Sequence, residues 1–478
     1  MPDYPNLELF IGGKWRKATE TLPVVNPANE AVIGALPIAR QSDLDDALEA
    51  ASTGFRIWSK TAPRERSDII MRAARLMRER MDDIGYSITL EHGKPFAQGQ
   101  LEVIRGSEFF EWDAGECQRL YGRAIPGVQG IRHTVLRQPI GAVAAFAPWN
   151  FPMSQPARKI AGALASGCSI ILKAAEETPA GAIHIARAFQ DAGLPDGVLN
   201  LVFGAPSEIS SYLIPKDEVR LVAFTGSTAV GRHLTNLASE NMTPVLMELG
   251  GHAPVIVCDD VDLSEVAPIC ADRKYRNAGQ VCTSPTRFYV PENGFETFTQ
   301  SFVEKANSTV VGDGLAKGTE MGPVANDRRL EAMAVLVEDA VSKGAELRCG
   351  GHRIGKKGYF FEPTVLANVP DNALIIGEEP FGPIAIINPV ASLEEGIKQA
   401  NRLPFGLAAY GFTHSAANVE QMVENVETGN LSINTLEASL PETPFGGVKS
   451  SGYGREGGEE GLHHYTVVKN VSHKMAIG

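Results

Sequence analysis

The middle of the chain alternates between short apolar runs and amphipathic segments. The amphipathic segments place apolar residues at helical spacing, as in Pro156–Ala165 and Ala180–Ala192. Such alternation predicts an open α/β sheet whose ligand sites lie at the carboxyl ends of its strands. The runs expected to form buried parallel strands are Gly141–Ala147, Ser169–Leu172, Leu199–Phe203, Leu221–Phe224 and Pro254–Val257.

Regular patterns also precede this region. The segment Leu9–Trp15 has the character of a hairpin. Apolar residues between positions 44 and 58 follow helical spacing, which predicts an amphipathic helix capped by Ser42, and a second helix is expected behind Pro63.

A second α/β stretch is expected to continue to about residue 435, with helices at Ala325–Lys343 and Leu393–Asn401. Near the end of the chain, Tyr465–Val471 has the pattern of a strand but no hairpin partner beside it. Such a strand is expected to pair with another domain or subunit. At 478 residues the chain is too long for one ordinary core, so two or three domains are expected.

Composition argues against several classes of function. The net charge of −13 disfavours a nucleic-acid or anionic-membrane surface, because both require clustered Lys and Arg. No apolar run approaches the roughly 20 residues of a membrane span, and the first residues lack the pattern of a signal peptide. The 6 cysteines have no metal-ligand spacing, so reduced thiols and no metal site are expected. These features together predict a cytoplasmic protein.

The segment Lys274–Pro285, with the sequence Lys-Tyr-Arg-Asn-Ala-Gly-Gln-Val-Cys-Thr-Ser-Pro, carries the most informative cysteine, Cys282. A thiol framed by a flexible Asn-Ala-Gly-Gln run and followed by a proline is typical of a presented nucleophile. Arg276 in the same segment can anchor an anionic substrate. The alternative is an inert buried cysteine, which is the commoner role of this residue type.

Two loops at the ends of expected strands combine rigidity with hydrogen-bond donors. In Pro148–Pro152, two prolines bracket an Asn and two aromatic residues, so the amide can donate to an oxyanion and the rings can wall a planar ligand. In Phe224–Gly231, Gly226 and Ser227 can face a phosphate at a helix N-terminus. Either loop can instead be purely structural, and the second lacks the full G-x-G-x-x-G pattern.

Carboxylates mark three further turns. Lys173–Pro179 places a lysine and a carboxylate at a strand end, which suits ribose hydroxyls or a simple helix cap. Glu248 stands in an apolar setting before two glycines, which predicts a raised pKa suited to a general base, unless the residue lies on the surface. Glu378–Pro383 can hold a ribose and press an aromatic ring on a ligand, or form only a turn.

In this order, the motifs resemble those of the aldehyde dehydrogenase superfamily, and in detail those of succinate-semialdehyde and 2-oxoglutarate-semialdehyde dehydrogenases. The resemblance extends from the region of Trp15 to the terminal strand. It implies a Rossmann-type dinucleotide-binding domain, an α/β catalytic domain and a small β oligomerisation unit. The ranges expected are 1–120 and 140–250 for NAD binding, 251–445 for the catalytic domain with the nucleophilic cysteine, and 121–139 and 461–478 for the oligomerisation strands.

The resemblance also implies a role for each motif. Cys282 corresponds to the nucleophile that forms a thiohemiacetal and then a thioester. The Asn150 amide and the Cys282 backbone N–H correspond to the oxyanion hole, and Glu248 to the base that activates water. Dinucleotide contacts are implied for Trp149, Lys173, Glu176, Gly226, Ser227, Glu379 and Phe381, and aldehyde contacts for Phe151 and Phe445.

Two arginines bear on the substrate. Arg158 and Arg276 match arginines that bind the substrate carboxylate in succinate-semialdehyde dehydrogenases, although either can form a structural salt bridge. The resemblance therefore implies a carboxylate-bearing semialdehyde, either succinate or 2-oxoglutarate semialdehyde, with an uncharged aliphatic or aromatic aldehyde as the alternative. Two residues past Cys282 stands Ser284 rather than a cysteine, so a disulfide switch at that spacing is not expected.

Glu176 bears on the cofactor. A carboxylate accepts hydrogen bonds from a ribose 2′-hydroxyl but repels a 2′-phosphate, so NAD is expected to be preferred, with NADP as the alternative. The chain departs from the family at Ala174, where proline is common, and at Ala229, where glutamate is common. Both departures leave the expected chemistry intact and the details of cofactor binding open.

Other family functions are less consistent with the chain. Glu248 argues against coenzyme A as the acyl acceptor, because relatives that use coenzyme A generally lack this base. An intact set of Cys282, Asn150 and Glu248 argues against a catalytically silent relative. The resemblance implies a homodimer or homotetramer, in which Tyr121–Pro139 and Tyr465–Val471 share a small sheet.

Overall fold

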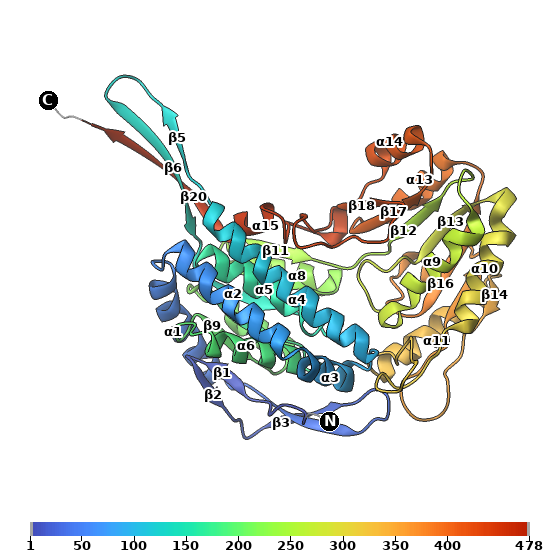
Figure 1. The fold of residues 1–478 in the computed structure, drawn as a ribbon, viewed down its shortest axis with the longest axis horizontal. Helices are drawn as coiled ribbons and strands as arrows, with labels where there is room; N and C mark the ends of the chain where they lie inside the picture. Colours follow the sequence, from blue (N-terminus) through green and yellow to red (C-terminus); the bar gives the residue numbers. More distant parts are fainter. Residues whose placement is uncertain (1–2, 476–478) are drawn as a thin grey trace.

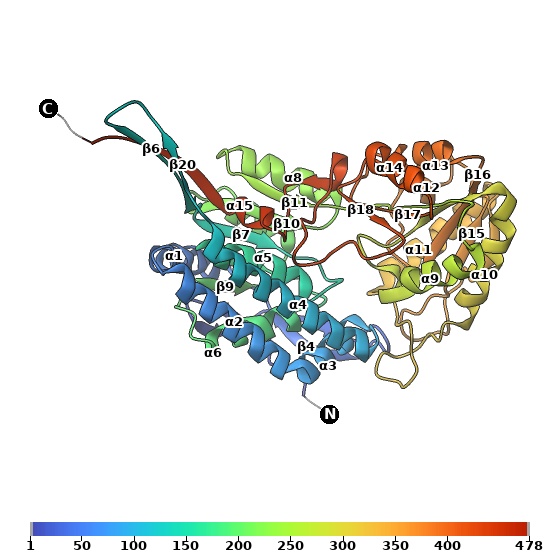
Figure 2. The same cartoon turned by 45° about the horizontal axis from the view of Figure 1, so that its top comes forward.

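The computed structural model describes residues 3–475, and these residues fold into two large α/β lobes with a slender arm (Figure 1). Figure 2 shows the same lobes from a second direction, with the N-terminal helices on one lobe and α10 and α11 on the other. This arrangement confirms the predicted α/β fold class. No helix among the described residues is long and apolar enough to cross a membrane.

The first lobe is built on a sheet with the strand order β19-β11-β10-β7-β8-β9-β1-β2. Its central strands are parallel and buried, as their apolar sequences predict. In chain order the strands are β1 (Leu9–Ile11), β2 (Lys14–Arg16), β7 (Ala142–Phe146), β8 (Ser169–Lys173), β9 (Leu199–Val202), β10 (Val219–Thr225), β11 (Val245–Glu248) and β19 (Gly452–Tyr453). The helices that accompany this sheet are α1 (Gln41–Trp58), α2 (Pro63–Glu79), α3 (Met81–His92), α4 (Phe96–Glu116), α5 (Ser154–Ser166), α6 (Ala180–Asp191), α7 (Pro206–Leu213) and α8 (Thr228–Ser239).

The strand order creates a crevice beside β7. After β7 the chain adds β8 and β9 on one side, and it then crosses to the other side to form β10 and β11. Loops that leave neighbouring strands in opposite directions open a crevice at the carboxyl ends of those strands. The loops after β7 and β10 therefore border the site where this fold binds ligands.

The second lobe has the sheet order β14-β15-β16-β13-β12-β17-β18. Its strands are β12 (Pro254–Val257), β13 (Arg287–Pro291), β14 (Glu346–Cys349), β15 (Thr364–Ala367), β16 (Ile384–Val390), β17 (Ala408–Phe412) and β18 (Asn430–Ile433). Its helices are α9 (Leu263–Tyr275), α10 (Phe295–Ser308), α11 (Asp327–Ser342), α12 (Leu374–Gly377), α13 (Leu393–Asn401) and α14 (Ala416–Asn425). The largest buried apolar clusters also follow the lobes, one drawn mainly from residues 9–249 and the other from residues 253–438.

The remaining elements are small. A hairpin of β3 (Thr21–Val25) and β4 (Val32–Pro37) lies near the N-terminus. The arm consists of β5 (Arg123–Pro126), β6 (Ile131–Pro139) and β20 (Thr466–Lys474) in the order β20-β6-β5, and it projects from the first lobe (Figure 1). The short helices are η1 (Cys117–Arg119), η2 (Arg276–Gly279), η3 (Glu292–Gly294), η4 (Lys449–Ser451) and α15 (Glu460–His463).

The arm confirms that the terminal strand pairs with the segment before residue 140, since β20 and β6 run antiparallel from Thr466 opposite Pro139 to Lys474 opposite Ile131. Residues 476–478 of the expected oligomerisation segment and residues 1–2 of the expected NAD-binding segment lie outside the described residues.

Two expectations about local structure were wrong, and one strand was not predicted. Ser42 does not cap α1, because the helix begins one residue earlier and Arg40 is its N-cap, with the Arg40 backbone N–H donating to Asp43 at 2.9 Å. Strand β12 belongs to the second sheet, where β13 and β17 flank it. Strand β11 was not expected, because its short run ends in a glutamate rather than in a turn residue.

Candidate active site

Cys282 lies on the loop that joins η2 to β13, and its partly exposed side chain lines a cavity. Before it, the backbone adopts left-handed conformations at Asn277, Ala278 and Gly279, with φ of 56°, 53° and 69°. Gly279 is required here, because a Cβ atom would lie 2.1 Å from the carbonyl oxygen of Gly382. The left-handed residues turn the chain sharply after α9. The segment that follows, which joins η2 to β13 and is called the cysteine loop below, then contacts Asn150 of the first lobe.

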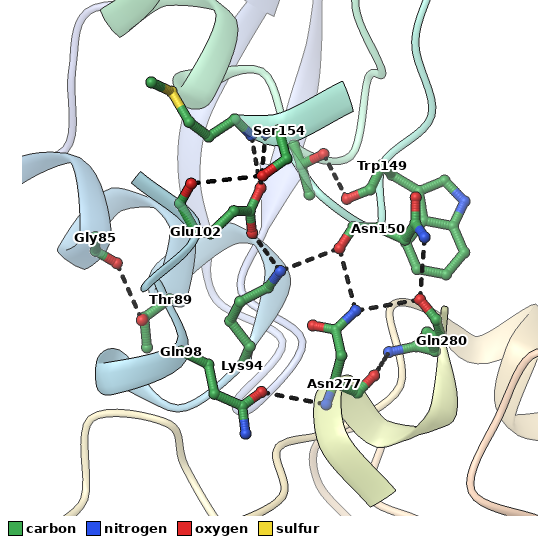
Figure 3. Close-up of polar contacts among 12 residues, drawn as sticks. Gly85, Thr89, Lys94, Gln98, Glu102, Trp149, Asn150, Ser154, Asn277 and Gln280 are labelled. Carbon is green, nitrogen blue, oxygen red and sulfur yellow. Dashed lines mark hydrogen bonds and ion pairs between the residues drawn. The ribbon is translucent and has the colours of Figure 1, made fainter. Parts of the chain in front are cut away.

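Asn150 reaches this loop from the segment that follows β7. Its Nδ2 atom donates to the Gln280 carbonyl oxygen at 3.1 Å, and the side chain is only 2% exposed (Figure 3). The Asn277 Nδ2 atom donates back to the Asn150 carbonyl oxygen at 3.1 Å. These reciprocal bonds hold the Asn150 amide against Gln280, which lies two residues before Cys282 in the sequence.

Glu248 ends β11 and is 3% exposed, with neither carboxylate oxygen hydrogen-bonded within the described structure. Burial, followed by the charge of Glu456, raises the pKa of Glu248 well above its usual value, while Lys159 and Arg158 act in the opposite direction. The raised pKa predicted for this carboxyl is confirmed. A carboxylate whose oxygens are free and whose pKa is raised is suited to accepting a proton.

The cationic partner that the local sequence around Glu248 lacks comes from α5. Lys159 is fully buried, and its Nζ atom donates to Glu456 at 2.8 Å and to Thr225 at 2.7 Å. Sequence reasoning missed Lys159 and Glu456. The available signal was a lysine within a helix whose other neighbours are almost all small or apolar, since such a lysine needs a buried partner.

The Cys282 thiol is in an environment that favours its neutral form. Burial raises its pKa to about 12, and the charges of Glu379 and Glu248 act in the same direction, while Arg158 opposes them. Because the thiolate is the reactive species, a neighbouring base must take the proton before or during attack. Glu248 and Glu379 are the carboxylates whose charges reach the thiol.

Arg158 and Arg276 lie in the same cavity as Cys282, which has a volume of about 850 Å³ including its open mouth. The Arg158 guanidinium lies 4.0 Å from the Phe109 ring centre and 4.8 Å from that of Phe445, and it donates to the Ser439 hydroxyl. Its Nη1 atom is buried and unbonded within the described structure.

Arg276 lies 5.8 Å from the centre of the Phe151 ring, and burial lowers its pKa to about 10, so that it stays protonated at neutral pH. Between residues 3 and 475 neither Arg158 nor Arg276 forms an ion pair with a carboxylate, in contrast to the structural salt bridge considered above. The cavity therefore contains two cationic groups with free hydrogen-bonding capacity. Ser439, a third polar group beside them, was missed because it lies 281 residues from Arg158 in sequence.

The residues expected to hold a dinucleotide lie around the crevice beside β7. Lys173 and Glu176 form an ion pair of 2.6 Å at the end of β8, and the rings of Trp149 and Phe381 meet edge to face with centres 5.4 Å apart. Burial raises the pKa of Glu379, which follows α12, to about 8.

At the end of β10, Gly226 donates its backbone N–H to the Glu248 carbonyl oxygen at 3.0 Å. A Cβ atom at this position would lie 2.4 Å from the Phe224 ring, so a larger residue here would require that ring to move. Ser227 caps α8 by accepting from the Val230 N–H, which confirms the expected helix start. The crevice suits the elongated shape of a dinucleotide. The N-terminus of α8 suits its negatively charged phosphates.

No cluster of three or more His, Cys, Asp or Glu side chains suited to a metal ion occurs between residues 3 and 475. The site therefore brings together one thiol, one amide, the Glu248 carboxyl, which has no hydrogen-bond partner among the described residues, and two arginines. Together these groups can perform covalent chemistry on a carbonyl group.

Comparison with known proteins points to one family. Residues 15–471 match the model of the aldehyde dehydrogenase family. The chain is 43% identical to 4-(hydroxymethyl)benzenesulfonate dehydrogenase from Comamonas testosteroni, over 97% of each protein. It is 38% identical to the NADP-dependent succinate-semialdehyde dehydrogenase of Escherichia coli (strain K12), over 97% of this chain and 96% of the relative. The crystal structure of succinate-semialdehyde dehydrogenase from Burkholderia pseudomallei superimposes with a TM-score of 0.96, at 38% identity and over 98% of each chain.

Proposed function

Because the chain belongs to the aldehyde dehydrogenase family, we propose that it oxidises an aldehyde with a distal anionic group, through a covalent intermediate on Cys282. The enzyme is an NAD(P)-dependent oxidoreductase. The observation that carries the proposal about the substrate is that two arginines, Arg158 and Arg276, line the cavity of the thiol and form no ion pair with a carboxylate of residues 3–475.

The proposed reaction begins at the Cys282 sulfur. Its lone pair forms a bond to the aldehyde carbon, the C=O π electrons move to oxygen, and the thiol proton passes to a neighbouring carboxylate. The developing oxyanion accepts hydrogen bonds from the Asn150 side-chain amide and the Cys282 backbone N–H. The buried position of Asn150 against the cysteine loop supports this role.

Hydrolysis completes the cycle. Glu248 takes a proton from water as the water oxygen attacks the thioester carbon, the C–S bond breaks, and the carboxylic acid leaves. The free oxygens and raised pKa of Glu248 support this role, and they favour water over coenzyme A as the acyl acceptor. Within the buried Lys159–Glu456 pair, the Lys159 ammonium favours the ionised form of Glu248, whereas the Glu456 carboxylate disfavours it and raises the pKa of Glu248.

The dinucleotide is proposed to lie in the crevice beside β7. Lys173 and Glu176 would hold a ribose, the N-terminal end of α8 with Gly226 and Ser227 the phosphates, and Trp149, Glu379 and Phe381 the remainder. When bound, the cofactor accepts the hydride that the substrate carbon loses on the way from aldehyde to acid. The Glu176 carboxylate favours NAD over NADP, because it repels a 2′-phosphate.

The distal anion of the substrate is proposed to bind to Arg158 and Arg276. The named substrates of the relatives above, a semialdehyde of succinate and a benzenesulfonate, both carry an anionic group, and an arginine fork can bind either type. Succinate and 2-oxoglutarate semialdehydes are our first choices. The ring faces of Phe109, Phe151 and Phe445 in the same cavity support an aromatic or uncharged aldehyde as the second candidate.

We further propose the division of labour expected from the sequence, with residues 1–120 and 140–250 binding the cofactor and residues 251–445 contributing the nucleophile. The arm and the segment 461–478 would form a homodimer or homotetramer. The exposed valines of β20, on the free edge of the arm sheet, support this assignment. The scattered cysteines support a reducing compartment such as the cytoplasm.

A spectrophotometric screen tests the function. Purified protein is incubated with NAD or NADP and with anionic aldehydes (succinate, glutarate and 2-oxoglutarate semialdehydes and 4-formylbenzenesulfonate) or with uncharged butanal and benzaldehyde. We expect at least one anionic aldehyde to exceed its uncharged counterpart in kcat/KM by roughly 10- to 100-fold, as charged hydrogen bonds predict. Equal values for charged and uncharged partners would contradict the proposed substrate class, and inactivity toward all of them would contradict the proposed function.

A further inference from the structure

A buried ion pair lies beneath the Asn150 loop and takes no part in the chemistry described above. Lys94, which precedes α4, and Glu102, on the second turn of α4, are 2% and 4% exposed, and their charged atoms lie 2.5 Å apart. Burying two charges costs free energy that a single contact seldom recovers, so a pair of this kind calls for additional bonds. These bonds all lead to the catalytic loops (Figure 3).

Glu102 and Lys94 hold the loop from both ends. The Glu102 Oε1 atom accepts hydrogen bonds from the backbone N–H groups of Met153 at 2.8 Å and Ser154 at 3.2 Å. The Lys94 Nζ atom donates to the Asn150 carbonyl oxygen at 3.1 Å. The ion pair therefore fixes the peptide of Asn150 and the residues that follow it.

The same helix also contacts the cysteine loop. Gln98 lies one helical turn before Glu102, and its Oε1 atom accepts from the Asn277 backbone N–H at 3.2 Å. The Asn277 amide then donates to both the Asn150 and Gln280 carbonyl oxygens. One face at the start of α4 thus contacts the loop that carries the amide and the loop that carries the thiol, and it joins the two lobes at that point.

We propose that Lys94 and Glu102 are positioning residues that fix the Asn150 amide relative to the Cys282 sulfur. This inference rests on the proposed roles of Asn150 and Cys282. Lys94 acts through the backbone of Asn150, because its ammonium group donates hydrogen bonds to Glu102 and to the Asn150 carbonyl oxygen. Loss of the pair leaves the thiol in place but displaces the donor that stabilises the oxyanion.

A competing role follows from the position of Lys94 in the cavity. Its Nζ atom lies 4.4 Å from the Phe151 ring centre, and the residue lines the same space as Arg158 and Arg276. A cation at this place can also bind the distal anion of the substrate. The two roles differ in a measurable way, because an anion-binding residue affects only charged substrates, whereas a positioning residue affects every aldehyde.

The test compares Lys94→Met with Arg78→Met, a matched control that removes a more exposed ion pair between α2 and Glu111 of α4. Each purified variant is assayed with succinate semialdehyde and with butanal, and alkylation of Cys282 by iodoacetamide is followed by peptide mapping. We expect Lys94→Met to lower kcat by roughly 30- to 100-fold on both aldehydes, with KM and the alkylation rate within about 3-fold of wild type, since a small displacement of an oriented group has an effect of this size. Arg78→Met is expected to match wild type.

Other outcomes contradict the proposal in distinct ways. A wild-type kcat in folded Lys94→Met overturns it, and so does a loss confined to succinate semialdehyde, which would assign Lys94 to anion binding. Equal losses in kcat and in alkylation would mean that the whole site had collapsed. If Lys94→Met does not fold, Lys94→Met/Glu102→Gln removes both charges, and normal turnover in that variant also overturns the proposal. Wild-type protein that oxidises neither aldehyde would instead contradict the proposed function itself.

Discussion

In the proposed mechanism, the reaction at Cys282 depends on moving a proton away from a thiol whose pKa burial has raised to about 12. Glu248, whose own pKa is raised by burial and by Glu456, is the best placed of the carboxylates to act as a base toward water, because both of its oxygens are free within the described structure. A carboxyl with a raised pKa stays protonated at lower pH and gains its basic form only as the pH rises through that value. Activity that depends on Glu248 must therefore increase from acidic toward alkaline pH.

We predict that Glu248→Gln lowers steady-state kcat by roughly 100-fold or more, since general base catalysis contributes about 10²- to 10⁴-fold. The first turnover should still release one equivalent of NAD(P)H, because formation of the thioester precedes hydrolysis. Stopped-flow measurements between pH 6 and 9.5 check both effects, with Glu240→Gln, an exposed residue at the end of α8, as the control. A variant that retains the wild-type kcat and its rise with pH would rule out Glu248 as the base.

At the scale of elements, the arm exposes apolar side chains that no other part of the described chain covers. β20 lies at the free edge of its sheet, and Val467, Val468 and Val471 are 42%, 64% and 37% exposed. An exposed edge strand with apolar side chains pairs readily with another chain. We therefore assign the arm to contacts between subunits.

We predict that Val468→Lys weakens the oligomer, because a charge placed in an apolar interface loses its hydration without gaining a partner. Size-exclusion chromatography with light scattering should show a smaller species than wild type at the same concentration. Val335→Lys, on the exposed face of α11, serves as the control. An unchanged molar mass for Val468→Lys would place the interface elsewhere.

Elements were predictable where the signal is local. The helix predicted at Leu393–Asn401 has the same bounds as α13, and α2 begins at Pro63 as expected. Both predictions depend only on neighbouring residues, through helical spacing and a proline in the first turn. The sheet to which β12 belongs was not predictable in the same way. Its apolar run requires a buried strand but does not specify which strands flank it.

For the candidate site too, local features could be predicted and long-range contacts could not. The residues with roles implied by the motifs, such as Asn150 and Cys282, could be identified, because each lies in a distinctive short segment. Their supports could not, since Lys159 meets Glu456 across 297 positions and Lys94 meets Asn150 across 56. Contacts at such separations arise only after the chain has folded. The local sequence can show that Lys159 needs a buried partner, but it does not identify Glu456 as that partner.

At the scale of the whole molecule, a chain with a net charge of −13 places two arginines inside the cavity that contains Cys282, and within the described part of the chain neither arginine pairs with a carboxylate. An acidic surface offers no general attraction to anions, so we attribute the proposed selectivity for an anionic aldehyde to these two groups. The other cations that line the cavity, Lys94, Arg105 and Arg273, are already paired with carboxylates. We propose that Arg158 and Arg276 select the substrate through its distal charge.

The measurement that tests this claim most directly is the ratio of kcat/KM for succinate semialdehyde to that for butanal, repeated with 4-formylbenzenesulfonate and benzaldehyde, in wild type, Arg158→Met and Arg276→Met. The control is Arg348→Met, which removes a surface ion pair with Glu296. We predict that each cavity variant lowers the ratio by roughly 30-fold or more, because loss of a charged hydrogen bond costs about 2 kcal/mol, while the control leaves it unchanged. Equal losses on the charged and uncharged aldehydes would contradict the claim.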